Sequence, residues 1–118
     1  MEISKYDDII DSRDVEERIE ELQDEENPDN HQQQELDALI ALRNEAKDYN
    51  CEWQYGEQLI RDTYFKDYCM ELAEDVGAID ANAVWPYTCI DWEMASRELK
   101  YDYTSVDFDG VDYWIRST

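Results

Sequence analysis

The chain is poor in the residues that build most catalytic and metal centres. It has one histidine, and its three cysteines, Cys51, Cys69 and Cys89, are too widely spaced for a CxxC pair. A zinc site and a Ser/His/Asp or Cys/His catalytic group are therefore not expected, and His31 is expected to be solvated. Three glycines leave no P-loop or dinucleotide-binding pattern. The odd, scattered cysteines indicate reduced thiols in a cytoplasm, not a disulfide framework.

A calcium site is also not expected. The twelve positions from Asp24 to Glu35 have the length of an EF-hand loop. However, Asp29 stands where that loop needs glycine, and Pro28 occupies a ligand position. Carboxylates are too numerous to single out a catalytic pair, so an enzyme stays an alternative only if folding brings two acids into a dry pocket with raised pKa values. We expect no catalytic residues, no metal and no cofactor.

The shortage of basic residues says most about the function of the chain. Ten Lys and Arg residues face 32 Asp and Glu residues, which gives a formal net charge of −22. Net charges of roughly 2–8 are enough to keep a small domain soluble, so the excess calls for a functional explanation. It argues against direct binding to nucleic acid or to anionic membranes, because both need Lys and Arg. It favours a protein partner with a basic surface.

Long apolar runs are absent too. No stretch approaches the length of a membrane span, and the charged start MEISKYDDIID predicts no signal peptide. An aromatic content of 13% nevertheless separates the chain from disordered acidic tails, which are poor in aromatic residues. The acidity is therefore expected on a folded body.

Helical periodicity dominates the first part of the chain. We expect helices over 11–26 and 32–49, joined by the turn sequence NPDN into an acidic helical hairpin. Asp11 is a candidate N-cap, with Ile10 and Val15 placed for a hydrophobic staple. The apolar stripe of the hairpin is narrow, so it must pack on a sheet or on a second subunit, which makes a homodimer an expectation. The stripe consists of Val15, Ile19, Leu22, Leu36, Leu39 and Ile40.

The second half changes from helical to alternating periodicity. A helix is expected over 57–76, with Val76 facing inward and Gly77 ending it, then an irregular stretch, then a short helix from its cap Asp91 to Leu99. Residues 104–115 alternate around Asp109-Gly110, which predicts a β-hairpin. The expected class is α+β: mainly helical, with the acidic hairpin of residues 1–50 as one domain, and residues 51–118 forming a second with a small antiparallel sheet.

The acids recur at helical spacing. Acidic residues at i and i+3 or i+4 lie on one helix face with their Cβ atoms about 5–6 Å apart, a spacing that resembles that of successive charges on a nucleic-acid backbone. Two acidic strips and their neighbours are therefore the candidate partner-binding, phosphate-mimicking residues. They are Glu17, Glu20, Glu21, Asp24 and Glu25 in the first strip, Asp67, Glu71, Glu74 and Asp75 in the second, and Glu57, Asp62, Glu93, Glu98 and Asp102 beside it.

A pattern of aromatics and acids in the second half resembles a known family. The residues that carry it are Tyr64-Phe65 with Tyr68, Leu72-Ala73-Glu74-Asp75-Val76-Gly77, Ile90-Asp91-Trp92-Glu93, Ala95 with Arg97-Glu98-Leu99, Asp102-Tyr103, Gly110 and Tyr113. Residues 57–116 thereby resemble the C-terminal portion of the ArdA antirestriction proteins, which phages, plasmids and transposons carry. Residues 1–50 depart from that family, whose N-terminal domains are missing here.

The resemblance implies a function. ArdA proteins are elongated acidic dimers that mimic bent duplex DNA and block type I restriction–modification enzymes. This chain is therefore expected to be a phage-type inhibitor that occupies the DNA-binding groove of a DNA- or RNA-guided host defence protein in the bacterial cytoplasm. Two alternatives stay open: an anti-CRISPR protein acting on the positively charged channel of an effector complex, and an acidic adaptor that binds a basic protein without displacing DNA.

Overall fold

The computed structural model describes residues 3–76 and 89–118 of the chain. Its helices and strands in those ranges are β1 (Ile9–Asp11), α1 (Ser12–Gln23), α2 (Asn30–Tyr49), β2 (Gln58–Arg61), α3 (Phe65–Asp75), α4 (Trp92–Leu99), β3 (Tyr103–Phe108) and β4 (Val111–Arg116). Short 3₁₀ helices span Trp53–Tyr55, Asp62–Tyr64 and Lys100–Asp102. The predicted α+β class, with its N-terminal helical hairpin and C-terminal β-hairpin, is confirmed.

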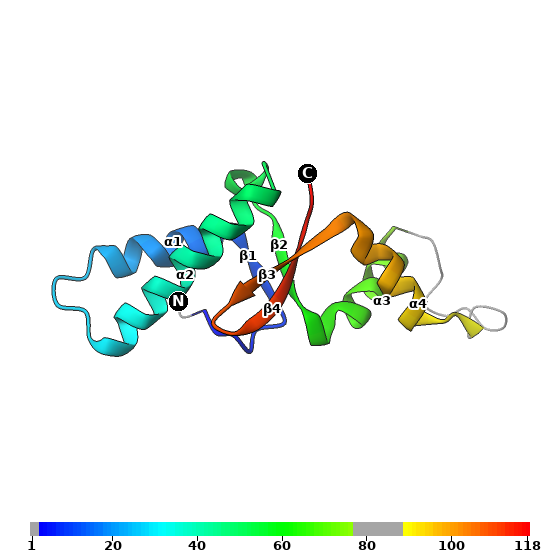
Figure 1. Cartoon of the computed structure of the whole chain (residues 1–118), viewed down its shortest axis with the longest axis horizontal. Coiled ribbons are helices and arrows are strands. Elements are labelled where there is room, and N and C mark those ends of the chain that lie inside the picture. The colour runs from blue at the N-terminus through cyan, green and yellow to red at the C-terminus, as the bar shows by residue number, and fades with distance from the viewer. Residues whose placement is uncertain (1–2, 77–88) are drawn as a thin grey trace.

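The strands form one antiparallel sheet in the order β1-β2-β4-β3 (Figure 1). The expected Asp-Gly turn joins β3 to β4, and both of its residues, Asp109 (φ 52) and Gly110 (φ 84), adopt the positive φ that a tight hairpin requires. Side chains alternate across the sheet, so Tyr113 and Ile115 of β4 enter the main core while Trp114 lies on the opposite face.

The hairpin of α1 and α2 packs on the sheet and supplies half of the main core. Val15, Ile19 and Leu22 of α1 are buried together with Leu39 and Leu42 of α2. Their partners in the core come from the loop before β2 and from the strands, and they include Trp53, Leu59, Val106, Phe108, Tyr113 and Ile115. One chain therefore buries Val15, Ile19, Leu22 and Leu39 of the apolar stripe by itself and leaves Leu36 and Ile40 partly buried. The core draws on residues from both sides of position 50.

Side-chain caps explain where the helices begin. Asp11 accepts a hydrogen bond from the Arg13 amide at α1, and Asp91 accepts one from the Met94 amide at α4, as predicted. At α2, Asp29 and Gln32 form a reciprocal capping box, which starts that helix slightly earlier than its periodicity suggested.

A smaller cluster of aromatic rings joins α3 to the other face of the sheet. The Phe65 ring lies 5.2 Å from that of Tyr103 and 6.0 Å from that of Trp114, between ring centroids. α4 packs against α3, so the two helices form the end of the molecule opposite the α1–α2 hairpin, with the sheet between them (Figure 1). The result is an elongated body with extents of 59 × 24 × 23 Å.

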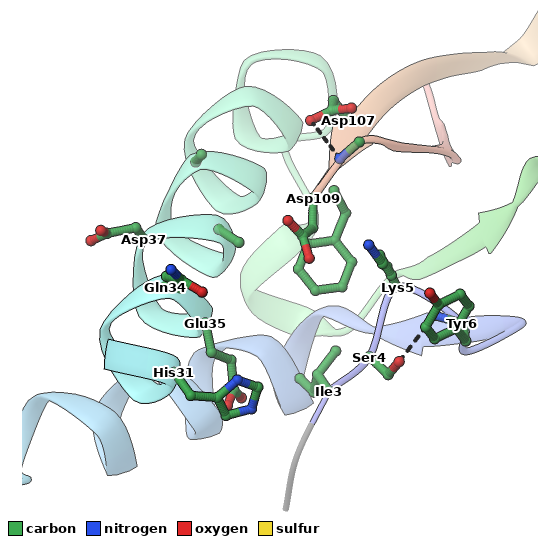
Figure 2. A pocket seen from close by; sticks show the side chains of 14 residues that line it. Ile3, Ser4, Lys5, Tyr6, His31, Gln34, Glu35, Asp37, Asp107 and Asp109 are labelled. Carbon is green, nitrogen blue, oxygen red and sulfur yellow. Dashed lines mark hydrogen bonds between the residues drawn. The ribbon is translucent and has the colours of Figure 1, made fainter. Parts of the chain in front are cut away.

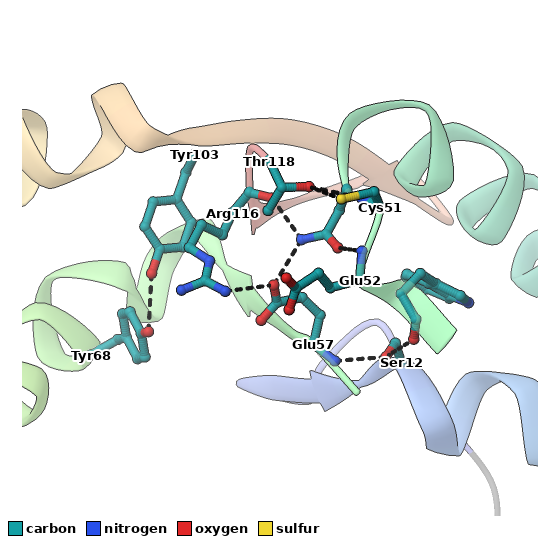
Figure 3. Close-up of polar contacts among 10 residues, drawn as sticks. Ser12, Cys51, Glu52, Glu57, Tyr68, Tyr103, Arg116 and Thr118 are labelled. Atoms are coloured by element: carbon teal, nitrogen blue, oxygen red, sulfur yellow. Dashed lines mark hydrogen bonds and ion pairs between the residues drawn. The ribbon is translucent and has the colours of Figure 1, made fainter. Parts of the chain in front are cut away.

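The segment between α2 and β2 fastens the hairpin to the sheet through buried polar contacts (Figure 3). Asn50 is 1% exposed; its amide nitrogen donates to Glu57 Oε2 (2.8 Å) and to the Arg116 carbonyl (2.7 Å). The buried Ser12 hydroxyl donates to the Trp53 carbonyl (2.8 Å) and accepts from the Glu57 amide (2.7 Å). These bonds join α1, α2 and β4 to one short loop.

The helix expected over 57–76 was wrong in its first part. Residues 58–61 form β2, the strand between β1 and β4, and the helix α3 begins only at Phe65. A short apolar run such as Leu59-Ile60 fits a helix and a strand buried on both faces equally well, so periodicity could not separate them. Val76 was also expected to face inward but is 68% exposed. The predicted helix end at Gly77 and most of the irregular stretch after it lie outside the described residues.

Candidate acidic partner-binding surface

The α1 strip lies on the helix face away from the core. Val15, Ile19 and Leu22 turn inward, so the acids between them turn to solvent. Glu17 and Glu20 follow this rule on α1 and are exposed. The helix expected over 11–26 ends at Gln23, so Asp24 is its C-cap and Glu25 lies beyond it, and both are exposed as well. Glu21 is also exposed, but it pairs with Arg18 at 3.0 Å.

The second strip lies at the opposite end of the molecule. Asp67, Glu74 and Asp75 are exposed on α3, where Phe65 and Cys69 are the buried positions. Glu71 is exposed too, and its carboxylate accepts a hydrogen bond from the Tyr64 hydroxyl at 2.6 Å. The neighbouring candidates Glu93, Glu98 and Asp102 are exposed on α4 and the turn after it, and Glu93 pairs with Lys66 at 3.3 Å.

Glu57 and Asp62 differ from the other candidates because each carboxylate accepts hydrogen bonds from two side chains of the same chain. The Glu57 side chain is 16% exposed, and its Oε2 accepts hydrogen bonds from the Asn50 amide nitrogen and, at 3.3 Å, from Arg116. Asp62 accepts hydrogen bonds from the Trp114 indole nitrogen at 2.9 Å and from Lys100 at 3.1 Å. The structure thus brings the two strips to the surface and places Glu57 and Asp62 where their first contacts are internal.

Most positive charges are already matched inside the chain. At least seven of the ten Lys and Arg residues pair with carboxylates, among them Arg18 with Glu35 at 2.6 Å and Arg43 with Glu16 at 3.7 Å. The exposed surface therefore offers a partner a strongly negative field with few cations to offset it.

Each described carboxyl whose pKa departs from its ordinary value departs downward. The side-chain hydrogen bond from Arg13 lowers the pKa of Asp11, Arg18 lowers that of Glu21, and the Trp114 indole followed by Lys100 lowers that of Asp62. These groups remain charged at neutral pH. A pocketed acid pair with raised pKa values, which would have favoured an enzyme, is not found among the described residues.

An open groove of about 760 Å³ lies beside the hairpin (Figure 2). Three segments line it: residues 3–6, one face of α2 from His31 to Ala41, and the β3–β4 turn. Its apolar surface comes from Ile3, Ala38 and Phe108 among others, and its acids are Glu35, Asp37, Asp107 and Asp109.

Two further features of the described ranges bear on chemistry. Within residues 3–76 and 89–118, no group of three or more His, Cys, Asp and Glu side chains is arranged to hold a metal ion. In the same part of the chain, no helix combines the length and the apolar character needed to cross a membrane.

Neither the groove nor the Asn50 network could be predicted from the sequence. Both join segments far apart in the chain, so spacing along the sequence carries no signal for them. One feature of the sequence could have indicated that Asn50 is buried: it follows a helix directly and stands three residues before Trp53. Most other acids and amides in the described ranges are exposed to solvent. Comparison with known proteins adds no constraint, since no protein-family model, curated protein or solved structure matches this chain.

Proposed function

We propose that this protein is an acidic DNA mimic that inhibits a bacterial defence enzyme, most directly a restriction–modification enzyme, by occupying its DNA-binding groove. The observation that carries the proposal is the charge density of an elongated body. A net charge of −22 along 59 Å is one charge per roughly 2.7 Å, against one per roughly 1.7 Å for duplex DNA. The length corresponds to about 17 base pairs at 3.4 Å each.

The placement of the strips supports the same proposal. The α1 strip and the α3 strip lie at opposite ends of the long axis (Figure 1). Two separated charged surfaces on one elongated body can engage a long basic groove at both ends, as a stretch of duplex would. The resemblance of residues 57–116 to ArdA proteins points to the same class of target.

The acidity is kept although it weakens the fold. Asp107 and Asp112 face each other directly across β3 and β4, and like charges in that position repel. Self-repulsion at a net charge of this size also destabilises the compact state. A surface that retains such costs is better explained by a partner than by solubility alone.

In this proposal the protein performs no chemistry and needs no cofactor. Its carboxylates replace DNA phosphates on the Lys and Arg residues of the partner, so the counterions of both surfaces are released on binding. Affinity is spread over many acids, because each ion pair contributes a similar small increment, and no single carboxylate is dominant. Contact with nucleic acid or a membrane is not part of the mechanism, and the site of action is the cytoplasm of the infected bacterium.

A displacement assay tests the proposal. A type I restriction–modification enzyme is bound to labelled duplex DNA, and the protein is added in increasing amount while bound label and DNA cleavage are followed. Wild-type protein is expected to release the duplex and stop cleavage. The variant Asp67→Asn, Glu74→Gln, Asp75→Asn is expected to need about tenfold more protein, since three ion pairs of about 0.5 kcal/mol each are lost.

A matched variant separates the strip from net charge. Asp48→Asn, Glu52→Gln, Asp112→Asn also removes three exposed acids, but from positions outside both strips and outside the groove. It should lower potency less than the α3 variant does. Simultaneous binding of the protein and DNA to the enzyme would instead favour the acidic adaptor. Displacement of the guide–target duplex from a CRISPR effector, with no effect on restriction enzymes, would favour the anti-CRISPR alternative.

A further inference from the structure

We propose that the groove between α2 and the β3–β4 turn binds an arginine-bearing segment of the partner protein. This rests on the proposed function, since it names what the basic partner places against this part of the acidic surface. The groove volume of about 760 Å³ lies in the range of sites that hold small ligands. It is larger than one side chain requires, so it fits an arginine together with its neighbouring backbone.

The groove offers an apolar surface to the stem of such a side chain. Ile3 and Phe108 are almost fully buried and belong to the main core, and Ala38 and Ala41 add small apolar positions along α2. Arginine lays its methylene groups on surfaces of this kind while its guanidinium stays among polar groups. The small alanines leave the space open.

The charges around the groove favour a cation. Asp37, Asp107 and Asp109 line it with a single lysine, Lys5, to offset them. Glu35 also lines it but is neutralised by Arg18, whose guanidinium bonds both carboxylate oxygens at 2.6 and 3.0 Å. Figure 2 shows Asp109 reaching from the turn into the space between α2 and residues 3–6.

The wall formed by residues 3–6 already holds a cation against an aromatic ring. The Lys5 ammonium lies 5.6 Å from the centroid of the Tyr6 ring, and Tyr6 is 71% exposed. An incoming guanidinium can stack on that ring and donate to several carboxylates at once, which a lysine ammonium does less well. Lys5 therefore competes with the ligand for the Tyr6 ring and adds a positive charge to the groove lining.

The test uses the full chain and a capped hexapeptide containing two arginines separated by glycines, with a citrulline peptide as the neutral control. Binding is followed by backbone amide NMR shifts. The arginine peptide is expected to shift residues 37–41 and 107–110. Asp37→Asn with Asp109→Asn should weaken it about fivefold, and Lys5→Gln should strengthen it about twofold. Asparagine tolerates the positive φ at position 109, so the turn survives.

Two controls keep the result interpretable. Glu17→Gln with Glu20→Gln removes the same charge from the α1 strip and should change peptide affinity less than twofold. Ala41→Leu adds bulk without charge and should block the groove, while leucine keeps the helix. Equal loss in the two charge-removal variants, equal binding of the citrulline peptide, or no shifts at the groove would overturn the proposal.

The displacement assay distinguishes a failure of the groove proposal from a failure of the proposed function. If the groove variant lost the peptide but displaced DNA as wild type does, the groove would not be the partner's arginine site, and the DNA-mimic proposal would stand. If the peptide bound the groove but wild-type protein displaced no DNA, the mimic proposal would fall by itself.

Discussion

Replacing Asn50 should test the polar network that fastens the hairpin to the sheet. Its side chain is almost fully buried and makes three hydrogen bonds, to Glu57, to the Arg116 carbonyl and from the Glu52 amide, at 2.7–2.8 Å. Asn50→Ala removes all three hydrogen bonds, and each buried polar group left without a partner costs about 1–3 kcal/mol. With water relieving part of the loss, we expect destabilisation of about 3 kcal/mol.

Urea unfolding followed by tryptophan fluorescence measures this loss. For a small domain with an m-value of about 2 kcal/mol/M, the midpoint should fall by about 1.5 M. Asn44→Ala is the matched control, because it makes the same change at an exposed position of α2. It should leave stability unchanged or raise it slightly, since alanine favours a helix. A loss of less than about 0.5 kcal/mol for Asn50→Ala would refute the network's role.

The isosteric change Asn50→Asp adds a pH test. The aspartate keeps an oxygen that accepts the hydrogen bond of the Glu52 backbone amide. It places a second carboxylate oxygen where the Asn50 side-chain nitrogen had donated to Glu57 at 2.8 Å. Two carboxylates in contact raise the pKa of the pair in the folded state, so the folded state binds more protons than the unfolded chain. Stability of this variant, relative to wild type, should therefore recover as the pH falls from 7 towards about 4.

Three further predictions concern stability. Gly56→Ala should cost about 1–2 kcal/mol, because Gly56 has φ +102, which strains a residue with a Cβ, whereas the exposed Arg13 side chain can move away from the added methyl group. Thermal unfolding measures this cost, and an unchanged midpoint would count against strain. Asp112→Thr should stabilise by about 0.5 kcal/mol by removing the repulsion with Asp107, and a loss in urea unfolding would contradict this. Burial raises the pKa of Tyr113 to about 12, so the free energy of unfolding should fall as the pH rises from 10 to 12. Tyr113→Phe should reduce that fall by about 2 kcal/mol. An identical alkaline profile for variant and wild type would contradict the raised pKa of Tyr113.

Local signals in the sequence predicted the helices and the hairpin turn. Asp11 and Asp91 cap their helices through bonds to amides two or three residues away, and Asp109-Gly110 meets the φ requirement of its turn without help from the rest of the chain. Exposure of the two acidic strips follows from the same helical periodicity, because the buried positions of α1 and α3 fix which side faces solvent.

The features that sequence reasoning missed depend on distant contacts. β2 forms because Leu59 pairs with Ile10 on one side and with Ile115 on the other, and neither pairing is encoded nearby. Glu57 faces inward because Asn50, the C-cap of α2, and Arg116 of β4 both donate hydrogen bonds to it. The groove likewise needs the tertiary arrangement of three segments, so a list of acids along the chain could not single out Asp109.

The dependence of partner binding on salt tests the central claim most directly. The affinity of the protein for a type I restriction–modification enzyme, the target that the proposed function names, would be measured over a salt series, with duplex DNA as competitor at each step. A DNA mimic should show log affinity falling linearly with log salt, with a slope steeper than about −4, and neutralising three strip acids should flatten it by up to about three. Protein and DNA should exclude each other throughout. Affinity that is indifferent to salt, or a ternary complex of enzyme, protein and DNA, would contradict the account.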